Sequence, residues 1–196
     1  MSRSAVWGLY GLLVVIWSST WVSIKIGLED SPALLGAGVR FTFAGLALLV
    51  VTAAIGRSLR TDFRLAAVLG VFPFALTYGL VYWGEQYIPS GLAAVLFGVL
   101  PLYVALGGAA FLPDQPLRAS VIVGVMIAIA GLALAFAESI DLGDADLAVA
   151  GAAALAAAPV GAAVGNISIK LRAEQLDPIP LNGWAMLGGG LLLLAA

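Results

Sequence analysis

Long, nearly uninterrupted apolar runs constrain the fold of this chain more than any other feature. Six runs are each long enough to cross a membrane as a helix, which takes roughly 20 residues. They cover residues 5–24, 33–55, 65–83, 91–112, 120–137 and 147–169, and a seventh begins near Leu181 and continues to Ala196. The runs do not alternate apolar with polar residues, so they predict helices and not barrel strands. We therefore predict an all-α, polytopic protein embedded in a lipid bilayer.

Composition supports this prediction and excludes several function classes. Hydrophobic residues make up 62% of the chain and charged residues 10%, whereas a soluble domain has about 45–50% and about 25%. The net charge of −2 gives no basic surface for a nucleic-acid partner. Cysteine and histidine are both absent, which removes the usual zinc ligands and the thiol and imidazole groups of many enzymes. We predict no metal, no cofactor and no enzymatic activity.

The distribution of basic residues predicts the orientation. With the N-terminus in the cytoplasm, seven of the nine Lys and Arg residues lie on the inner side, as the positive-inside rule requires. These seven are Arg3, Arg57, Arg60, Arg64, Arg118, Lys170 and Arg172. The acidic loop with Glu138, Asp141, Asp144 and Asp146 then lies outside. We predict a multi-pass protein of the inner or plasma membrane with a cytoplasmic N-terminus.

A short motif occurs twice, 145 positions apart. Residues 22–26 read Val-Ser-Ile-Lys-Ile, and residues 167–171 read Ile-Ser-Ile-Lys-Leu. Glu29 matches Glu174 at the same offset, and Pro32 matches Pro178 with one residue inserted. The copies are five predicted spans apart, and an odd number inverts the second copy in the membrane. Inverted repeats build many secondary transporters, with the substrate site between the halves. A match this short can also arise by chance, because apolar helices use few residue types.

The repeat predicts the domain organisation. Residues 1–145 would form a first five-helix repeat, and residues 146–196 would form the first two helices of a second. A repeat of this length implies a parent of roughly 290 residues. We therefore expect the chain to be about two thirds of a longer protein, with the missing C-terminal half of the same protein as its packing partner.

Several stretches resemble the EamA-type permeases of the drug/metabolite transporter superfamily. Residues 16–21 (Ile-Trp-Ser-Ser-Thr-Trp), 25–28 (Lys-Ile-Gly-Leu) and 39–41 (Val-Arg-Phe) resemble the opening of that family. Residues 85–96 (Glu-Gln-Tyr-Ile-Pro-Ser-Gly-Leu-Ala-Ala-Val-Leu), followed by Leu-Pro-Leu-Tyr at 100–103, carry the more specific signal. The resemblance implies ten helices in two inverted halves and a permease or exporter of a small organic solute, such as an amino acid, a metabolite or a drug. The chain departs from the family at residues 113–116 (Pro-Asp-Gln-Pro), where a Gly-Glu-Arg-like turn is common. It departs again at residues 156–158, which are alanines where the family often has a tryptophan.

Two spans carry polar and aromatic residues that suggest a solute site. The first offers Trp17, Ser18, Thr20 and Trp21, which could line a cavity with hydroxyl groups and indole rings; in the resembled family this helix borders the cavity. Alternatively, the hydroxyls bond to their own helix and the tryptophans form an interfacial belt.

The third span carries an aromatic stripe that ends in a carboxylate. Phe74, Tyr78, Tyr82 and Glu85 are spaced by four, four and three residues and share one helix face. Such a stripe could bind amines or flat rings, or it could be plain packing. Glu85 is also the candidate for a proton-coupling carboxylate.

Two further polar residues and three prolines lie within spans. Arg40, about two turns past Pro32, is expected to pair with Glu85, Glu29 or Asp30, or to reach the membrane surface, more than to contact substrate. Asn166 is expected to bond across the repeat interface or to face the cavity. Pro73, Pro101 and Pro159 should kink or break their helices, and the first two should shape the cavity. Gly161 and Gly165 predict a helix contact face.

These features favour a carrier that works by alternating access. A non-transporting scaffold or assembly subunit is the alternative, and a membrane-embedded enzyme is less favoured because clustered acids and histidines are absent. Proton coupling and facilitated diffusion both stay open.

Overall fold

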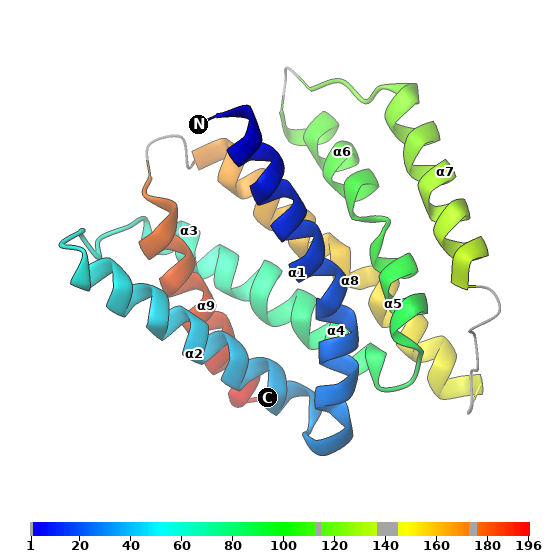
Figure 1. The fold of residues 1–196 in the computed structure, drawn as a ribbon, viewed down its shortest axis with the longest axis horizontal. Coiled ribbons are helices and arrows are strands. Elements are labelled where there is room, and N and C mark those ends of the chain that lie inside the picture. The colour runs from blue at the N-terminus through cyan, green and yellow to red at the C-terminus, as the bar shows by residue number, and fades with distance from the viewer. Residues whose placement is uncertain (1, 113–114, 137–144, 173–175) are drawn as a thin grey trace.

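The computed structural model describes residues 2–112, 115–136, 145–172 and 176–196, and in these ranges it contains helices and no strand (Figure 1). The helices are α1 (Arg3–Asp30), α2 (Ala33–Ala54), α3 (Phe63–Leu69), the π-helical η1 (Gly70–Leu76), α4 (Thr77–Glu85), α5 (Ser90–Phe97), α6 (Leu100–Phe111), α7 (Ala119–Phe136), α8 (Ala145–Arg172) and α9 (Pro178–Leu194). Helices α3, η1 and α4 follow one another without a gap, and α5 and α6 share another predicted span. The predicted all-α, polytopic fold is confirmed. Glu138, Asp141, Asp144, Glu174 and residues 113–114 lie outside the described residues.

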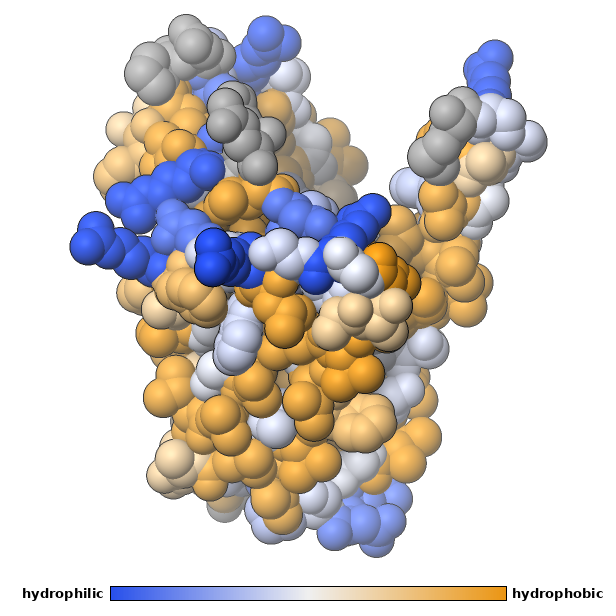
Figure 2. Space-filling model, turned by 90° about the vertical axis from the view of Figure 1, so that its left-hand side faces the viewer, coloured by the Kyte–Doolittle hydropathy of each residue, from blue (hydrophilic) through white to orange (hydrophobic). Residues whose placement is uncertain are grey.

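The molecule has the surface expected of a membrane protein. Five helical segments of the described chain are long and apolar enough to cross a bilayer. In Figure 2, apolar surface dominates the middle of the visible face, and hydrophilic residues gather across its upper part and at its lower edge. Large apolar side chains such as Trp7, Phe43 and Leu134 are exposed, which suits a lipid solvent and not water.

Two of the three membrane-embedded prolines interrupt their helices as predicted. Pro73 lies inside the π-helical turn η1. Pro101 stands in the first turn of α6, just after α5 has ended at Phe97. Pro159 does not break its span, because α8 continues through it. Neighbouring helices bond to the carbonyl groups beside it: the Thr77 hydroxyl lies 3.1 Å from the Ala158 oxygen, and the Tyr103 hydroxyl 3.3 Å from the Ala156 oxygen.

Helices α2 and α9 form the most extensive helix pair and run antiparallel, side by side in Figure 1. Gly38, near the start of α2, contacts Leu194 at the end of α9. Gly45, further along α2, contacts Gly183 near the start of α9. A methyl group added at Gly45 would lie 2.7 Å from the Gly183 carbonyl oxygen. Small residues therefore allow the two backbones to approach closely.

Helix α8 crosses the π-helical turn through the predicted glycine face. An added Cβ at Gly161 would lie 2.6 Å from the Phe72 carbonyl oxygen, and one at Gly165 would lie 2.8 Å from the Pro73 ring. The predicted contact face is therefore confirmed. It brings α8 and η1 together along one side of the site described below.

The two repeated lysines occupy opposite ends of the span formed by α5 and α6. The Lys25 ammonium group donates to the carbonyl oxygens of Glu85 (2.7 Å), Gln86 (3.4 Å) and Ile88 (3.0 Å), just before α5 begins. The Lys170 ammonium group lies 3.0 Å from the side-chain oxygen of Gln115, past the end of α6. The motif copies therefore point to opposite ends of the bundle.

Candidate functional site

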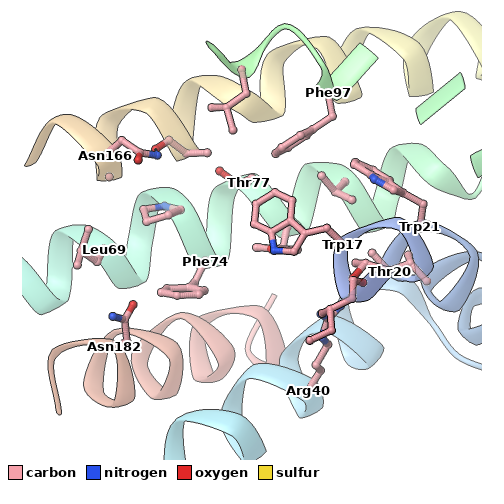
Figure 3. Close-up of a pocket in the computed structure, with 18 of the residues that line it drawn as sticks. Trp17, Thr20, Trp21, Arg40, Leu69, Phe74, Thr77, Phe97, Asn166 and Asn182 are labelled. Atoms are coloured by element: carbon pink, nitrogen blue, oxygen red, sulfur yellow. The ribbon is translucent and has the colours of Figure 1, made fainter. Parts of the chain in front are cut away.

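A cavity of about 290 Å³ lies where the broken span α3–η1–α4 faces α1, α2, α8 and α9 (Figure 3). Its walls are mainly aromatic and aliphatic, which is typical of small-molecule sites. The π-helical turn contributes Pro73 and Phe74, and the break between α5 and α6 contributes Phe97 and Leu100. The interrupted helices therefore supply part of the wall.

Aromatic rings surround the middle of the cavity. Trp17 and Trp21 enter from α1, and the Trp21 ring packs edge-on against Phe97 with 5.4 Å between ring centroids. Tyr78 of α4 also lines the cavity and packs on Phe41 in a tilted arrangement, with 4.5 Å between ring centroids. In Figure 3 the Trp17 ring reaches into the centre of the site. Such walls suit a solute with an apolar or flat part.

Polar groups enter this apolar space from several helices. Thr20, Thr77, Asn166 and Asn182 line it, together with Arg40 from α2. Arg40 is the only lining residue, among the described part of the chain, that carries a formal charge at neutral pH. In Figure 3 the two asparagines lie toward one end of the view and Arg40 toward the other.

The partners of Arg40 differ from those expected. Its guanidinium group donates to the Tyr82 hydroxyl at 3.2 Å and lies over the rings of Phe41 (5.5 Å) and Tyr78 (5.9 Å). It makes no ion pair with Glu29, Asp30 or Glu85, all of which the structure describes. The expected pairing with an acid is therefore wrong: Tyr78 and Tyr82 of α4, together with the neighbouring Phe41, contact the guanidinium group instead.

Six of the nine residues proposed from the sequence lie around one cavity. These are Trp17, Thr20, Trp21, Arg40, Tyr78 and Asn166. Ser18 is on α1 but outside the lining, and its hydroxyl donates to the Val14 carbonyl oxygen at 2.6 Å. Tyr82 is also outside and reaches the site only through its bond to Arg40.

Glu85 lies outside the cavity lining as well. Its side chain is fully buried at the end of α4, and neither carboxyl oxygen has a hydrogen-bond partner among the described residues. Its backbone carbonyl, however, accepts the hydrogen bond from Lys25. The Glu85 carboxyl group is therefore buried in the core and is not part of the cavity lining.

The hydroxyl groups of α1 bond to carbonyl groups of their own helix, which was the alternative to a role in solute binding. Ser19 and Thr20 donate to the Ile16 carbonyl oxygen at 3.0 and 2.8 Å, and Ser23 donates to that of Ser19 at 2.8 Å. Thr20 nevertheless lines the cavity, where its oxygen can still accept a hydrogen bond. The other lining residues of this helix are apolar or aromatic: Ile16, Trp17, Trp21 and Ile24.

Several lining residues escaped the sequence analysis, among them Thr77, Phe97 and Asn182. Asn182 is the lone amide in the last apolar run, and this polarity was the signal that could have identified it. Thr77 follows Pro73 by one turn, and its hydroxyl lies 3.0 Å from the Phe72 carbonyl oxygen; a hydroxyl within an apolar span was the signal for it. Phe97 gave no signal, because one more aromatic residue in an apolar run is unremarkable. Among the described residues no three His, Cys, Asp or Glu side chains gather closely enough to hold a metal.

Comparison with known proteins identifies the family. A family model described as the EamA-like transporter family matches residues 5–137. The chain belongs to the EamA-like transporter family. No solved structure gives a significant match.

Three curated relatives illustrate the similarity. Protein PagO of Salmonella typhimurium is 30% identical over 129 residues, which cover 63% of this chain and 41% of PagO. The uncharacterized transporter YoaV of Bacillus subtilis is 26% identical over 93% of this chain and 63% of YoaV. The uncharacterized inner membrane transporter YedA of Escherichia coli is 42% identical over 46% of this chain and 31% of YedA. The chain thus spans less than two thirds of the length of these relatives.

Proposed function

We propose that the protein carries a small organic solute across the membrane by alternating access, with the solute bound in the cavity around Trp17. One observation carries this proposal: the cavity is lined by both predicted repeats. Trp17, Arg40 and Tyr78 come from residues 1–145, whereas Asn166 and Asn182 come from residues 146–196. A solute in this cavity would contact both repeats. Rotation of one repeat against the other would then open the shared site first to one side of the membrane and then to the other.

The arrangement of equivalent helices supports an inverted repeat. Helix α2 begins directly after Pro32, α9 begins at the matching Pro178, and the two helices run antiparallel. Lys25 and Lys170 lie at opposite ends of the α5–α6 span. Both relations are expected for helices related by a half-turn about an axis in the membrane plane. We further propose that the N-terminus and the Arg57 loop face the cytoplasm, as the positive-inside rule predicts.

Solute flux through the full-length protein in proteoliposomes tests the proposal. Entry of labelled amino acids and related metabolites should depend on the protein. Trp17→Ala and Tyr78→Ala should each lower that flux at least about ten-fold, because they remove cavity wall. Trp7→Ala and Tyr10→Ala are matched controls, since Trp7 and Tyr10 are on the same first helix, are 64% and 60% exposed and lie outside the lining. Both controls should transport normally.

The same assay separates the alternatives. Equal flux in liposomes with and without the protein would contradict a carrier and favour the scaffold. Wild-type flux from the Trp17 and Tyr78 variants would remove this cavity from the transport path. Repeating the assay with and without a pH gradient distinguishes proton coupling from facilitated diffusion.

A further inference from the structure

The charges around the cavity define the solute more closely than its shape does. Building on the proposed carrier function, we propose that the solute is a small monocarboxylate with an apolar or aromatic body, and that its carboxylate binds Arg40. Arg40 supplies the formal charge of the described lining, and no acidic side chain accompanies it there.

The Arg40 guanidinium group is oriented but not neutralised. It can donate five N–H groups, and the structure shows one hydrogen bond, to the Tyr82 hydroxyl at 3.2 Å. The rings of Phe41 and Tyr78 lie against it at 5.5 and 5.9 Å. These contacts hold the planar group in place and leave its positive charge without a carboxylate partner, which is unusual for an arginine within a membrane span. A bound anion would provide that partner.

A carboxylate matches this site better than other charged groups. A single guanidinium group balances one negative charge and binds a carboxylate through two parallel hydrogen bonds. A phosphate monoester carries about −1.5 to −2 charges and would leave negative charge uncompensated. An amine without a carboxylate would meet the positive Arg40, and the described lining offers no acid to offset that repulsion.

The rest of the cavity sets the nature of the solute body. Trp17, Trp21, Phe74 and Phe97 present apolar rings, and a volume of about 290 Å³ is at the small end of ligand pockets. The side-chain nitrogens of Asn166 and Asn182 already donate to their own helices, at 2.9 and 2.8 Å. Their oxygens therefore remain as acceptors at the end away from Arg40 (Figure 3). The site fits one ring or a short chain beyond the carboxylate.

A matched series of phenyl compounds tests the assignment by calorimetry on the full-length protein in lipid nanodiscs. The series is 3-phenylpropionate, phenylalanine, phenylalaninamide, 3-phenylpropionamide and 2-phenylethylamine. At least one of the two carboxylates should bind ten-fold or more tightly than every compound without a carboxylate, and comparing the two shows whether an α-ammonium group is accepted.

Arginine variants show whether Arg40 is responsible. Arg40→Gln should weaken carboxylate binding at least ten-fold, and Arg40→Lys should weaken it less, because the charge remains while the two-pronged geometry is lost. Binding of neutral 3-phenylpropionamide should not change in Arg40→Gln, which separates loss of charge from loss of fold. Arg57→Gln is the control: Arg57 lies outside the cavity, paired with Asp177 at 3.1 Å, and its loss should leave binding unchanged.

Three results would overturn the assignment: equal or tighter binding of the amine or amides, unchanged carboxylate binding in Arg40→Gln, or no binding of either carboxylate. The carrier proposal fails separately, when proteoliposomes show no protein-dependent flux of any solute. Flux of an amine or neutral solute with no response to carboxylates would leave the carrier standing and reject the carboxylate.

Discussion

Helices α1 and α8 carry the two copies of the repeated motif and have 28 residues each, yet they are packed very differently. Within the most apolar stretch of each helix, 44% of the residues of α8 are buried but only 6% of those of α1. Gly8 and Gly11 of α1 have open space where a side chain would stand, whereas Gly161 and Gly165 of α8 touch η1. Two helices that share a motif can therefore be buried to different extents. The extent of burial depends on whether the small residues of the helix face another helix.

The comparison also shows why apolar composition says little about packing in a membrane. Lipid tails are as apolar as leucine, so an exposed apolar face carries no penalty there. Helix α1 can place Trp7, Tyr10 and Val15 on its surface and still be a stable span. It contacts the bundle mainly through its second half, where Ile24 is buried.

The largest expected difference comes from adding one methyl group to each helix. Gly161→Ala should lower the free energy of unfolding by about 3 kcal/mol, because the new Cβ meets the Thr77 hydroxyl and the Phe72 carbonyl and forces α8 away from η1. Gly11→Ala should be neutral or stabilising by up to about 1 kcal/mol, since alanine favours helix and the position is open. Unfolding in mixed detergent micelles measures both. Equal losses would show that α1 is as tightly packed as α8.

The repeated lysines should differ by an intermediate amount. Lys25→Met should cost about 2 kcal/mol, because three carbonyl groups at the end of α4 lose a charged donor. Lys170→Met should change stability by no more than about 0.5 kcal/mol, because its one bond to Gln115 is exposed. Thermal unfolding of the two variants side by side measures the difference. A larger effect at Lys170 would contradict the roles assigned to the two lysines.

The smallest expected difference concerns two threonines in the cavity wall. Thr77→Val should cost about 1 kcal/mol, since the buried Thr77 hydroxyl joins α4 to the Ala158 carbonyl of α8. Thr20→Val should be close to neutral, because Thr20 bonds only within α1. Valine keeps the shape of threonine, so the same unfolding assay isolates the hydroxyl. Equal effects would mean that the bond between helices adds nothing beyond a bond within one helix.

Sequence periodicity predicted the positions of the helices better than it predicted which side chains contact one another. The apolar runs located every span, and the spacing of Gly161 and Gly165 identified a contact face, because both signals are local. The aromatic stripe was only half informative: Phe74 and Tyr78 line the cavity, whereas Tyr82 and Glu85 extend past it. The partner of Arg40 could not be predicted, since it depends on how far α4 lies from α2. Asn182 is a polar residue in an apolar run and could have been proposed from the sequence. Whether it lines the cavity, however, depends on where α9 crosses the bundle.

The most direct test of the account is the side of the membrane on which each copy of the motif ends. The chain contains no cysteine, so Glu29→Cys and Arg172→Cys, both at exposed positions, each introduce one labelling target into it. A membrane-impermeant thiol reagent applied to intact cells should label Glu29→Cys, and should label Arg172→Cys only after the membrane is opened. Labelling of both from the same side would contradict oppositely oriented repeats, and with them the shared cavity on which the carrier depends.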